Sequence, residues 1–114
     1  MFMARVIGHV WSTVKWDALT GLRLLLVRPY HLGDLQRLSG ALSAPAARRR
    51  PEGVVVADVL GAGPGEDVIV AYGHAARAAI EDLKPGGPAP SYPIDAAIVA
   101  IVDRFAVEPS SRIE

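Results

Sequence analysis

The hydrophobic residues of this chain fall into short runs of β-branched and aliphatic side chains, which glycine and proline interrupt. Runs of this length and composition predict β-strands. The first run alternates loosely, with Val6 and Val10 on one face and Ile7 and His9 on the other. The pattern predicts five strands, at residues 4–13, 22–27, 54–60, 68–72 and 98–102.

The segments between these runs predict one short helix and one long loop. Residues 74–83 contain good helix formers and no glycine or proline, so they are expected to be helical. Residues 28–53 contain glycine or proline at six positions and predict a long loop excursion. Four leucines within this excursion have helical spacing and favour a helical turn there: Leu32, Leu35, Leu38 and Leu42. Residues 104–114 predict a polar C-terminal tail.

Five strands and one short helix, without a strand–helix–strand rhythm, predict a mainly β fold. The expected architecture is a small five-stranded barrel of the oligonucleotide-binding (OB-like) type with a long inserted loop. A chain of 114 residues has room for one domain and not for two, so residues 1–114 are expected to form a single domain.

Composition adds an expectation of self-association. Hydrophobic residues make up 51% of the chain before its 11 glycines are counted. A domain of this size leaves about a third of its unfolded surface exposed, so it cannot bury that much apolar surface by itself. The excess predicts surface that is buried against a partner, and a further copy of the chain is the simplest partner.

Charge and cysteine content limit which other molecules the chain is expected to bind. Twelve basic and twelve acidic residues cancel, so no overall field steers the chain to nucleic acid or to an anionic membrane. Without cysteine it has neither disulfides nor thiolate metal ligands. No apolar run approaches the roughly 20 residues of a membrane helix, and the N-terminus lacks a signal-peptide pattern. We therefore expect a cytoplasmic protein.

A glycine-rich loop separates the third and fourth predicted strands. It consists of Gly61, Ala62, Gly63, Pro64 and Gly65. A dinucleotide-binding fingerprint would need a third glycine where Glu66 stands, followed by a helix, and strand residues follow instead. We therefore expect no nucleotide or other cofactor here. The segment must be a tight turn, and its lack of side chains would also let several copies approach one another around an axis.

The remaining polar residues offer no recognisable catalytic or metal site. Three histidines lack ligand-type spacing: His9, His31 and His74. Five carboxylates could in principle include an acid–base pair, but nothing supplies a nucleophile triad: Asp58, Glu66, Asp67, Asp95 and Asp103. We expect no metal and no catalytic residue. Glu66 and Arg77 are interpreted either as partners in loop or subunit contacts or as solvated surface charges.

Four blocks of sequence, taken in order, carry a resemblance to a known family. The second contains the glycine loop, with Asp58 before it and Glu66 after it, and the third is Gly73-His74-Ala75-Ala76-Arg77, where the family has Gly-Ser-Ser-Ala-Arg. The blocks are residues 8–15 with 19, 21 and 23–27, then 57–70, 73–77 and 93–103. Together they cover about half of the chain. The sequence resembles the EutN/CcmL family, the pentameric vertex proteins of carboxysomes and other bacterial microcompartment shells.

The resemblance implies a structural shell protein and not an enzyme. It implies a homopentamer at the shell vertices, with hexameric shell proteins as partners and no cofactor. Residues 61–65 are then expected to lie near the fivefold axis and border a pore, with Glu66 and Arg77 in subunit contacts.

An alternative of another class is an oligomeric, OB-type nucleic-acid-binding protein. It would need a basic groove with aromatic side chains on which bases stack. Trp11, Trp16, Tyr30 and Tyr72 could stack with bases, and the run Arg48-Arg49-Arg50 is the basic cluster.

Overall fold

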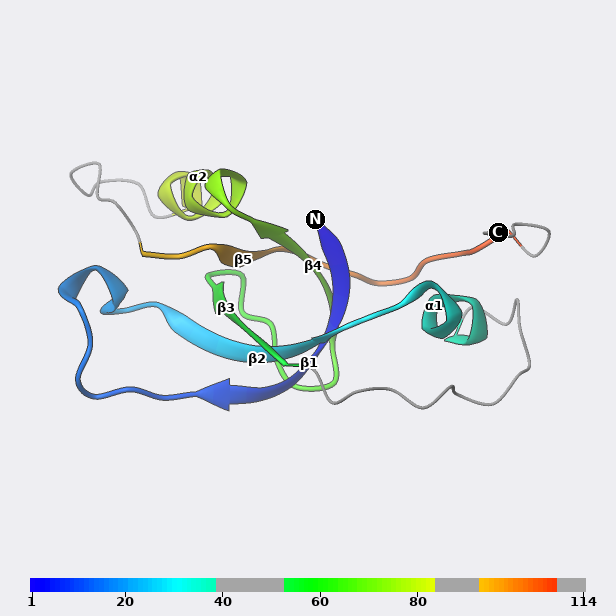
Figure 1. Cartoon of the computed structure of the whole chain (residues 1–114), viewed down its shortest axis with the longest axis horizontal. Helices are drawn as coiled ribbons and strands as arrows, with labels where there is room; N and C mark the ends of the chain where they lie inside the picture. The colour runs from blue at the N-terminus through cyan, green and yellow to red at the C-terminus, as the bar shows by residue number, and fades with distance from the viewer. Residues whose placement is uncertain (39–52, 84–92, 109–114) are drawn as a thin grey trace.

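The protein folds as a closed five-stranded barrel. The computed structural model describes residues 1–38, 53–83 and 93–108. The strands are β1 (Phe2–Val10), β2 (Arg23–Pro29), β3 (Val54–Asp58), β4 (Asp67–Tyr72) and β5 (Ala96–Ile101). They follow one another around the barrel in the order β1-β2-β3-β5-β4, and β4 pairs with β1 to close it (Figure 1). Only β3 and β5 run parallel among these pairs. This confirms the predicted small barrel.

The interior of the barrel is filled by the alternate residues of its strands. Ala4 and Val6 of β1 and Leu25 and Val27 of β2 are buried, whereas Ile7 is exposed on the opposite face of β1. Successive side chains of a strand point to opposite faces, so each strand contributes every second residue to the core. The branched aliphatic side chains that predicted the strands are therefore those that pack inside the barrel.

A second cluster of buried residues lies between the barrel and the helix α2 (His74–Leu83), whose bounds match the predicted helix. Ala76 and Ile80 of the helix pack against Ala97 of β5, and the helix lies alongside β4 and β5 (Figure 1). The helix begins after Gly73, which has a positive φ of 67°. The Gly73 N–H donates to the Asp95 carbonyl at 2.7 Å, which fixes the helix start against the segment that leads into β5.

The long excursion predicted at residues 28–53 begins later than expected, because Arg28 and Pro29 pair with β1 as the end of β2. The leucine spacing correctly predicted a helical turn, and the structure has the helix α1 (Leu32–Leu38) there. The described residues thus contain two short α-helices, where the main pattern predicted one. Residues 39–52 of the excursion, Leu42 among them, and residues 109–114 of the predicted tail lie outside the described residues.

The β1–β2 connection is a long hairpin that projects from one end of the barrel (Figure 1). Strand β1 ends at Val10, three residues before the predicted end of the first strand, so residues 11–16 lie beyond the ladder. The 3-10 turn η1 (Asp17–Leu19) reverses the chain, and Gly21 follows with a positive φ of 84°. A glycine accepts such a backbone conformation without a steric penalty.

Candidate functional site

The first half of the glycine loop is anchored by Asp58, the last residue of β3. Its side chain is fully buried, and Oδ1 accepts a hydrogen bond from the Leu60 N–H at 3.0 Å. Oδ2 accepts from the N–H groups of Gly61 and Ala62 at 3.1 and 3.0 Å. Arg23 of β2 donates from Nη1 to the same oxygen at 2.8 Å. The buried carboxylate is therefore satisfied by the turn that follows it and by one guanidinium.

The second half of the loop is held by β1 and by the side chain of Glu66. The Gly65 N–H donates to the Val6 carbonyl at 2.8 Å, and the Val6 N–H donates to the Glu66 carbonyl at 2.9 Å. Glu66 Oε1 accepts from the Gly63 N–H at 2.8 Å. Gly61 and Gly65 have φ of 89° and 90°, which residues with a Cβ rarely adopt. The loop is thus fixed at both ends, and its backbone shape requires glycine at positions 61 and 65.

Ala62 differs from the other residues of the loop because its side chain is buried in the core of its own barrel. Its small size is therefore explained by packing within the subunit. The argument that a ring axis needs little bulk then applies only to the loop backbone. Gly61, Pro64, Gly65 and Glu66 are exposed. The surface of the loop consequently carries glycine, one proline and one carboxylate.

Glu66 and Arg77, predicted as partners or as solvated charges, are not joined in the subunit. The carboxylate of Glu66 closes the loop onto the Gly63 N–H, and Arg77 lies half-buried on α2. Ion pairs form at the Asp58 anchor and between Arg5 and Asp67, and neither contains Glu66 or Arg77. Their part in subunit contacts stays a prediction.

A polar cluster that the sequence did not predict joins β1, β4 and the residue after β2. Tyr30 Oη donates to Asp67 Oδ1 at 2.6 Å, and Arg5 Nε donates to the same oxygen at 3.1 Å. Burial, with the hydrogen bond to Asp67, raises the pKa of Tyr30 to about 12. The hydrogen bond to Asp67 also raises the pKa of Arg5. The cluster holds the barrel closed where β4 meets β1.

The described residues contain no group of three histidines and carboxylates that could hold a metal ion. Every buried side-chain nitrogen and oxygen among them has a hydrogen-bond partner. Asp58 and Asp67, two of the carboxylates considered for acid–base chemistry, are each bonded to an arginine. None of the helices in the described segments is long and apolar enough to cross a bilayer.

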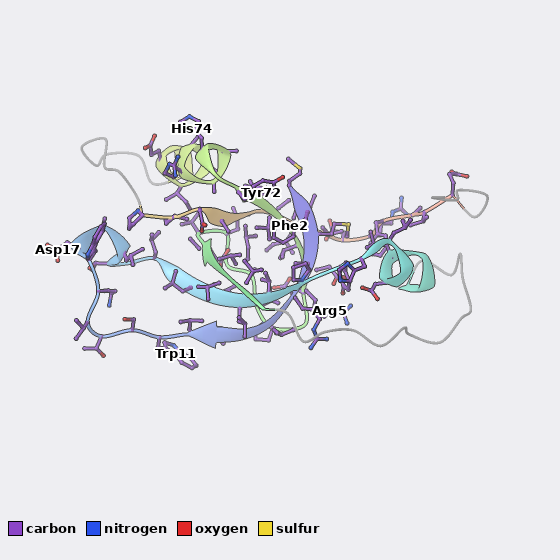
Figure 2. The ribbon with its side chains drawn as sticks, in the orientation of Figure 1. Phe2, Arg5, Trp11, Asp17, Tyr72 and His74 are labelled. Atoms are coloured by element: carbon purple, nitrogen blue, oxygen red, sulfur yellow. The ribbon has the colours of Figure 1, made fainter. Side chains whose placement is uncertain are left out.

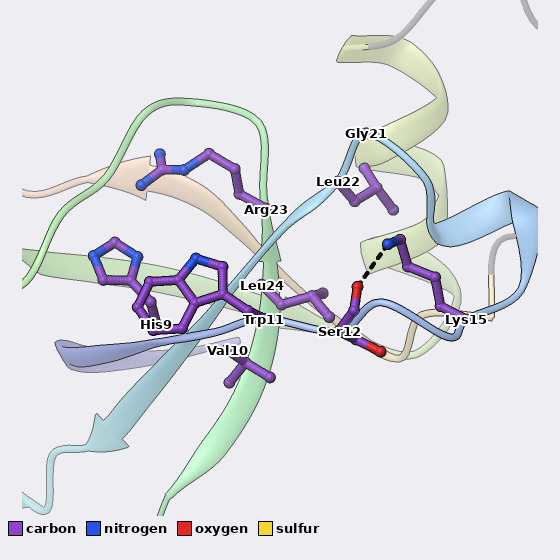
Figure 3. A pocket seen from close by; sticks show the side chains of 9 residues that line it. All are labelled: His9, Val10, Trp11, Ser12, Lys15, Gly21, Leu22, Arg23 and Leu24. Carbon is purple, nitrogen blue, oxygen red and sulfur yellow. Dashed lines mark hydrogen bonds between the residues drawn. The ribbon is translucent and has the colours of Figure 1, made fainter.

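A groove of about 230 Å³ runs along the hairpin between its two limbs (Figure 3). Trp11 lines it from β1's side and stacks on His9, with ring centroids 5.4 Å apart and planes at 22°. Lys15 Nζ donates to the Ser12 carbonyl at 2.6 Å and so keeps the first limb curled. Arg23 faces the groove from the second limb (Figure 3). This surface was not among the predicted site residues, although Trp11 was considered above as a residue that could stack with bases.

The aromatic residues of the nucleic-acid alternative do not share one surface. Trp11 lies on the hairpin and Tyr72 at the end of β4, on different parts of the molecule (Figure 2). Tyr30 donates its hydroxyl to Asp67. The basic run at residues 48–50 lies outside the described residues. The described part of the chain therefore does not supply the continuous stacking surface that this alternative requires.

Comparison with known proteins gives a consistent picture. The profile of the family described as "Ethanolamine utilisation protein EutN/carboxysome" matches residues 1–103. The carboxysome shell vertex protein CcmL of Thermosynechococcus vestitus is 39% identical over 103 residues, which cover 90% of this chain and 84% of that protein. The microcompartment shell vertex protein PduN of Salmonella typhimurium is 39% identical over 106 residues, covering 93% and 99% of the two chains.

A solved structure extends this similarity to three dimensions. The pentameric microcompartment shell protein GrpN of Rhodospirillum rubrum superposes with a TM-score of 0.65 and 32% identity, covering 95% of this chain and 99% of that one. The sequence match spans the anchored glycine loop, the barrel and α2, and the structural match covers nearly the whole chain. The chain belongs to the EutN/CcmL family.

Proposed function

We propose that this protein is a structural shell protein of a bacterial microcompartment, which forms cyclic pentamers at the vertices of a polyhedral shell. Its role is to supply the fivefold geometry that closes the shell. A flat layer of hexagonal tiles cannot curve into a closed shell without fivefold positions, and a ring of five subunits fills such a position. Heterologous contacts close into a ring when each subunit is rotated by one fifth of a turn from the last. The partners of the ring are hexameric shell proteins.

The observation that carries this proposal is the match to vertex proteins of three different microcompartments along nearly the entire chain. The structure supports it because the subunit exposes large apolar side chains that one copy leaves uncovered, among them Trp11, Trp16 and Tyr72. Assembly into a ring would cover such surface. The relatives are named for a structural role, which fits a protein that is not an enzyme.

Within the ring, we place residues 61–65 near the fivefold axis, at the border of a pore. Any side chain beside a fivefold axis is repeated five times in a small volume, so bulky groups are disfavoured there. The exposed part of the loop carries only Gly61, Pro64 and Gly65 before Glu66, and hydrogen bonds at both ends hold it rigid. Glu66 and Arg77 would then contact neighbouring subunits.

Co-production with hexameric microcompartment shell proteins tests the function. With this chain present, electron microscopy should show closed polyhedral shells, and the chain should copurify with them as a minor component. Without it, the same tiles should form sheets, tubes or shells open at their vertices. If the chain is absent from purified shells, or closure does not depend on it, the proposed function is wrong.

A further inference from the structure

Both tryptophans of the chain lie on the β1–β2 hairpin beyond the paired part of β1, and both are exposed. Trp11 is 84% exposed and Trp16 is 70% exposed, and Val14 between them is 94% exposed. Trp11 points away from the barrel at the lower edge of the hairpin (Figure 2). We call residues 11–16 the arm.

The arm exposes a large apolar area for so short a segment. A large aromatic side chain buries about 150–250 Å² when it is covered, so two tryptophans exposed to this degree present on the order of 300 Å². The largest exposed apolar patch of a typical monomer is of about this size and is often functional. A standard protein interface buries about 800 Å² on each partner, so the arm alone would supply a third or more of one side.

The arm borders the groove between the two limbs of the hairpin. Val10, Leu22 and Leu24 give this groove apolar walls, and Trp11 forms its rim (Figure 3). The hydrogen bond from Lys15 to the Ser12 carbonyl fixes the curl of the first limb in the single subunit. Trp11 also stacks on His9 in the single subunit, so less side-chain entropy is lost when a partner covers it.

We propose that the arm packs against a second copy of this chain, with Trp11 and Trp16 as its anchors. The inference rests on the proposed ring. In a cyclic ring each subunit contacts one neighbour with one surface and the other neighbour with a second surface, so the chain must carry two different patches. A second exposed aromatic patch does lie on another part of the molecule, where Tyr72 stacks on Phe2 at 6.2 Å (Figure 2). The chain therefore has two separate exposed aromatic patches, as a cyclic ring requires.

Arg23 lies between the groove and the glycine loop. This side chain lines the groove, and it donates from Nη1 to Asp58 Oδ2 at 2.8 Å and from Nη2 to the Ala62 carbonyl at 3.0 Å. A copy that covers the groove would therefore also contact a side chain that holds the glycine loop.

The two tryptophans make intrinsic fluorescence a direct reporter of the arm. We would measure emission and acrylamide quenching of the full chain at ring-forming and at dilute concentrations, with the mass followed by light scattering. The chain in denaturant supplies the reference for full exposure. As the mass rises, emission should move to shorter wavelength and quenching should fall well below the denatured reference.

Two paired variants separate contact from folding. Trp11→Ala with Trp16→Ala should raise the concentration at which half of the assembly dissociates by roughly 30-fold or more, as the loss of an interface hot spot does. Trp11→Phe with Trp16→Phe keeps most of the apolar area and should assemble almost as the natural chain does. Circular dichroism at the same concentration should show an intact barrel in both variants.

The outcomes distinguish this proposal from the proposed function. A pentamer whose tryptophans are quenched as readily as in denaturant, or an alanine variant that assembles normally, would overturn the arm contact and leave the ring intact. Protection that arises only when hexameric shell proteins are added would overturn it as well, because the occupant would then be a tile. Protection in a dimer would support the self-contact and instead refute the pentamer.

Discussion

Replacement of Asp58 by asparagine should show that the glycine loop is held mainly by a buried carboxylate. This side chain is fully buried and accepts three backbone N–H bonds and one bond from Arg23. Asparagine has nearly the same shape, but it carries no charge and its NH₂ group cannot accept. Whichever of the two oxygen positions the NH₂ group takes, at least one N–H that donated to Asp58 then faces a donor instead of an acceptor.

The size of the effect follows from burial. Each buried donor left without an acceptor costs about 1–3 kcal/mol. The Ala62 N–H is buried, whereas Gly61 can reach water and the Arg23 side chain is 47% exposed, so we expect Asp58→Asn to lower the free energy of unfolding by about 2–3 kcal/mol. Arg23→Gln is the matched control. The Arg23 side chain is 47% exposed, and the three N–H bonds remain after its loss, so we expect a cost of about 1.5 kcal/mol.

Urea unfolding followed by circular dichroism measures both variants. All samples must have the same subunit concentration, because assembly adds to the apparent stability. The reasoning would be refuted if Arg23→Gln cost as much as Asp58→Asn, since the ion pair and not the turn would then hold the loop. A cost below about 1 kcal/mol for Asp58→Asn would refute it too.

Three further predictions concern other parts of the subunit. Gly65→Ala should cost about 1–2 kcal/mol in urea unfolding because its φ is 90°, whereas Gly33→Ala, in open space on α1, should gain about 0.5–1 kcal/mol; equal effects would contradict this. The folded state keeps the Tyr30 proton to about pH 12, against 10.0 ordinarily, so its contribution to stability is complete below pH 10 and is lost as the pH rises through about 12. Tyr30→Phe should abolish that part of the pH dependence, and an unchanged profile would assign it elsewhere. Glu66→Gln and Arg77→Gln should weaken the ring by light scattering while barely changing the subunit's circular dichroism; rings of native stability would remove both residues from the contacts.

The barrel could be predicted from sequence because each strand has a buried face. Val68 and Val70 of β4 are buried with the less buried Ile69 between them, and the sequence shows this strand as a β-branched run between Gly65 and Gly73. The helix α2 was predicted with its true bounds, since Gly73 precedes it and no breaker interrupts it. The end of β1 was misplaced because residues 11–13 remain β-prone although they have no partner strand opposite them.

The detailed site could not be predicted because its contacts join distant residues. Tyr30 and Asp67 are 37 positions apart, and nothing in local pattern says that their side chains meet. The roles of Asp58 and Ala62 depend on which face of the loop turns inward, and a glycine-rich stretch has no periodicity to reveal that. The family resemblance indicated that Asp58 belongs to the motif, and the geometry explains why: it is the acceptor around which the turn forms.

The central claim is that five copies of this chain form a closed ring, and light scattering coupled to size exclusion tests it most directly. The measured mass should equal five subunits of 12.1 kDa at micromolar concentration and should not grow further as the concentration rises, because a closed ring has no unsatisfied contact of the same kind. A mass of one, two or four subunits under these conditions would contradict the account.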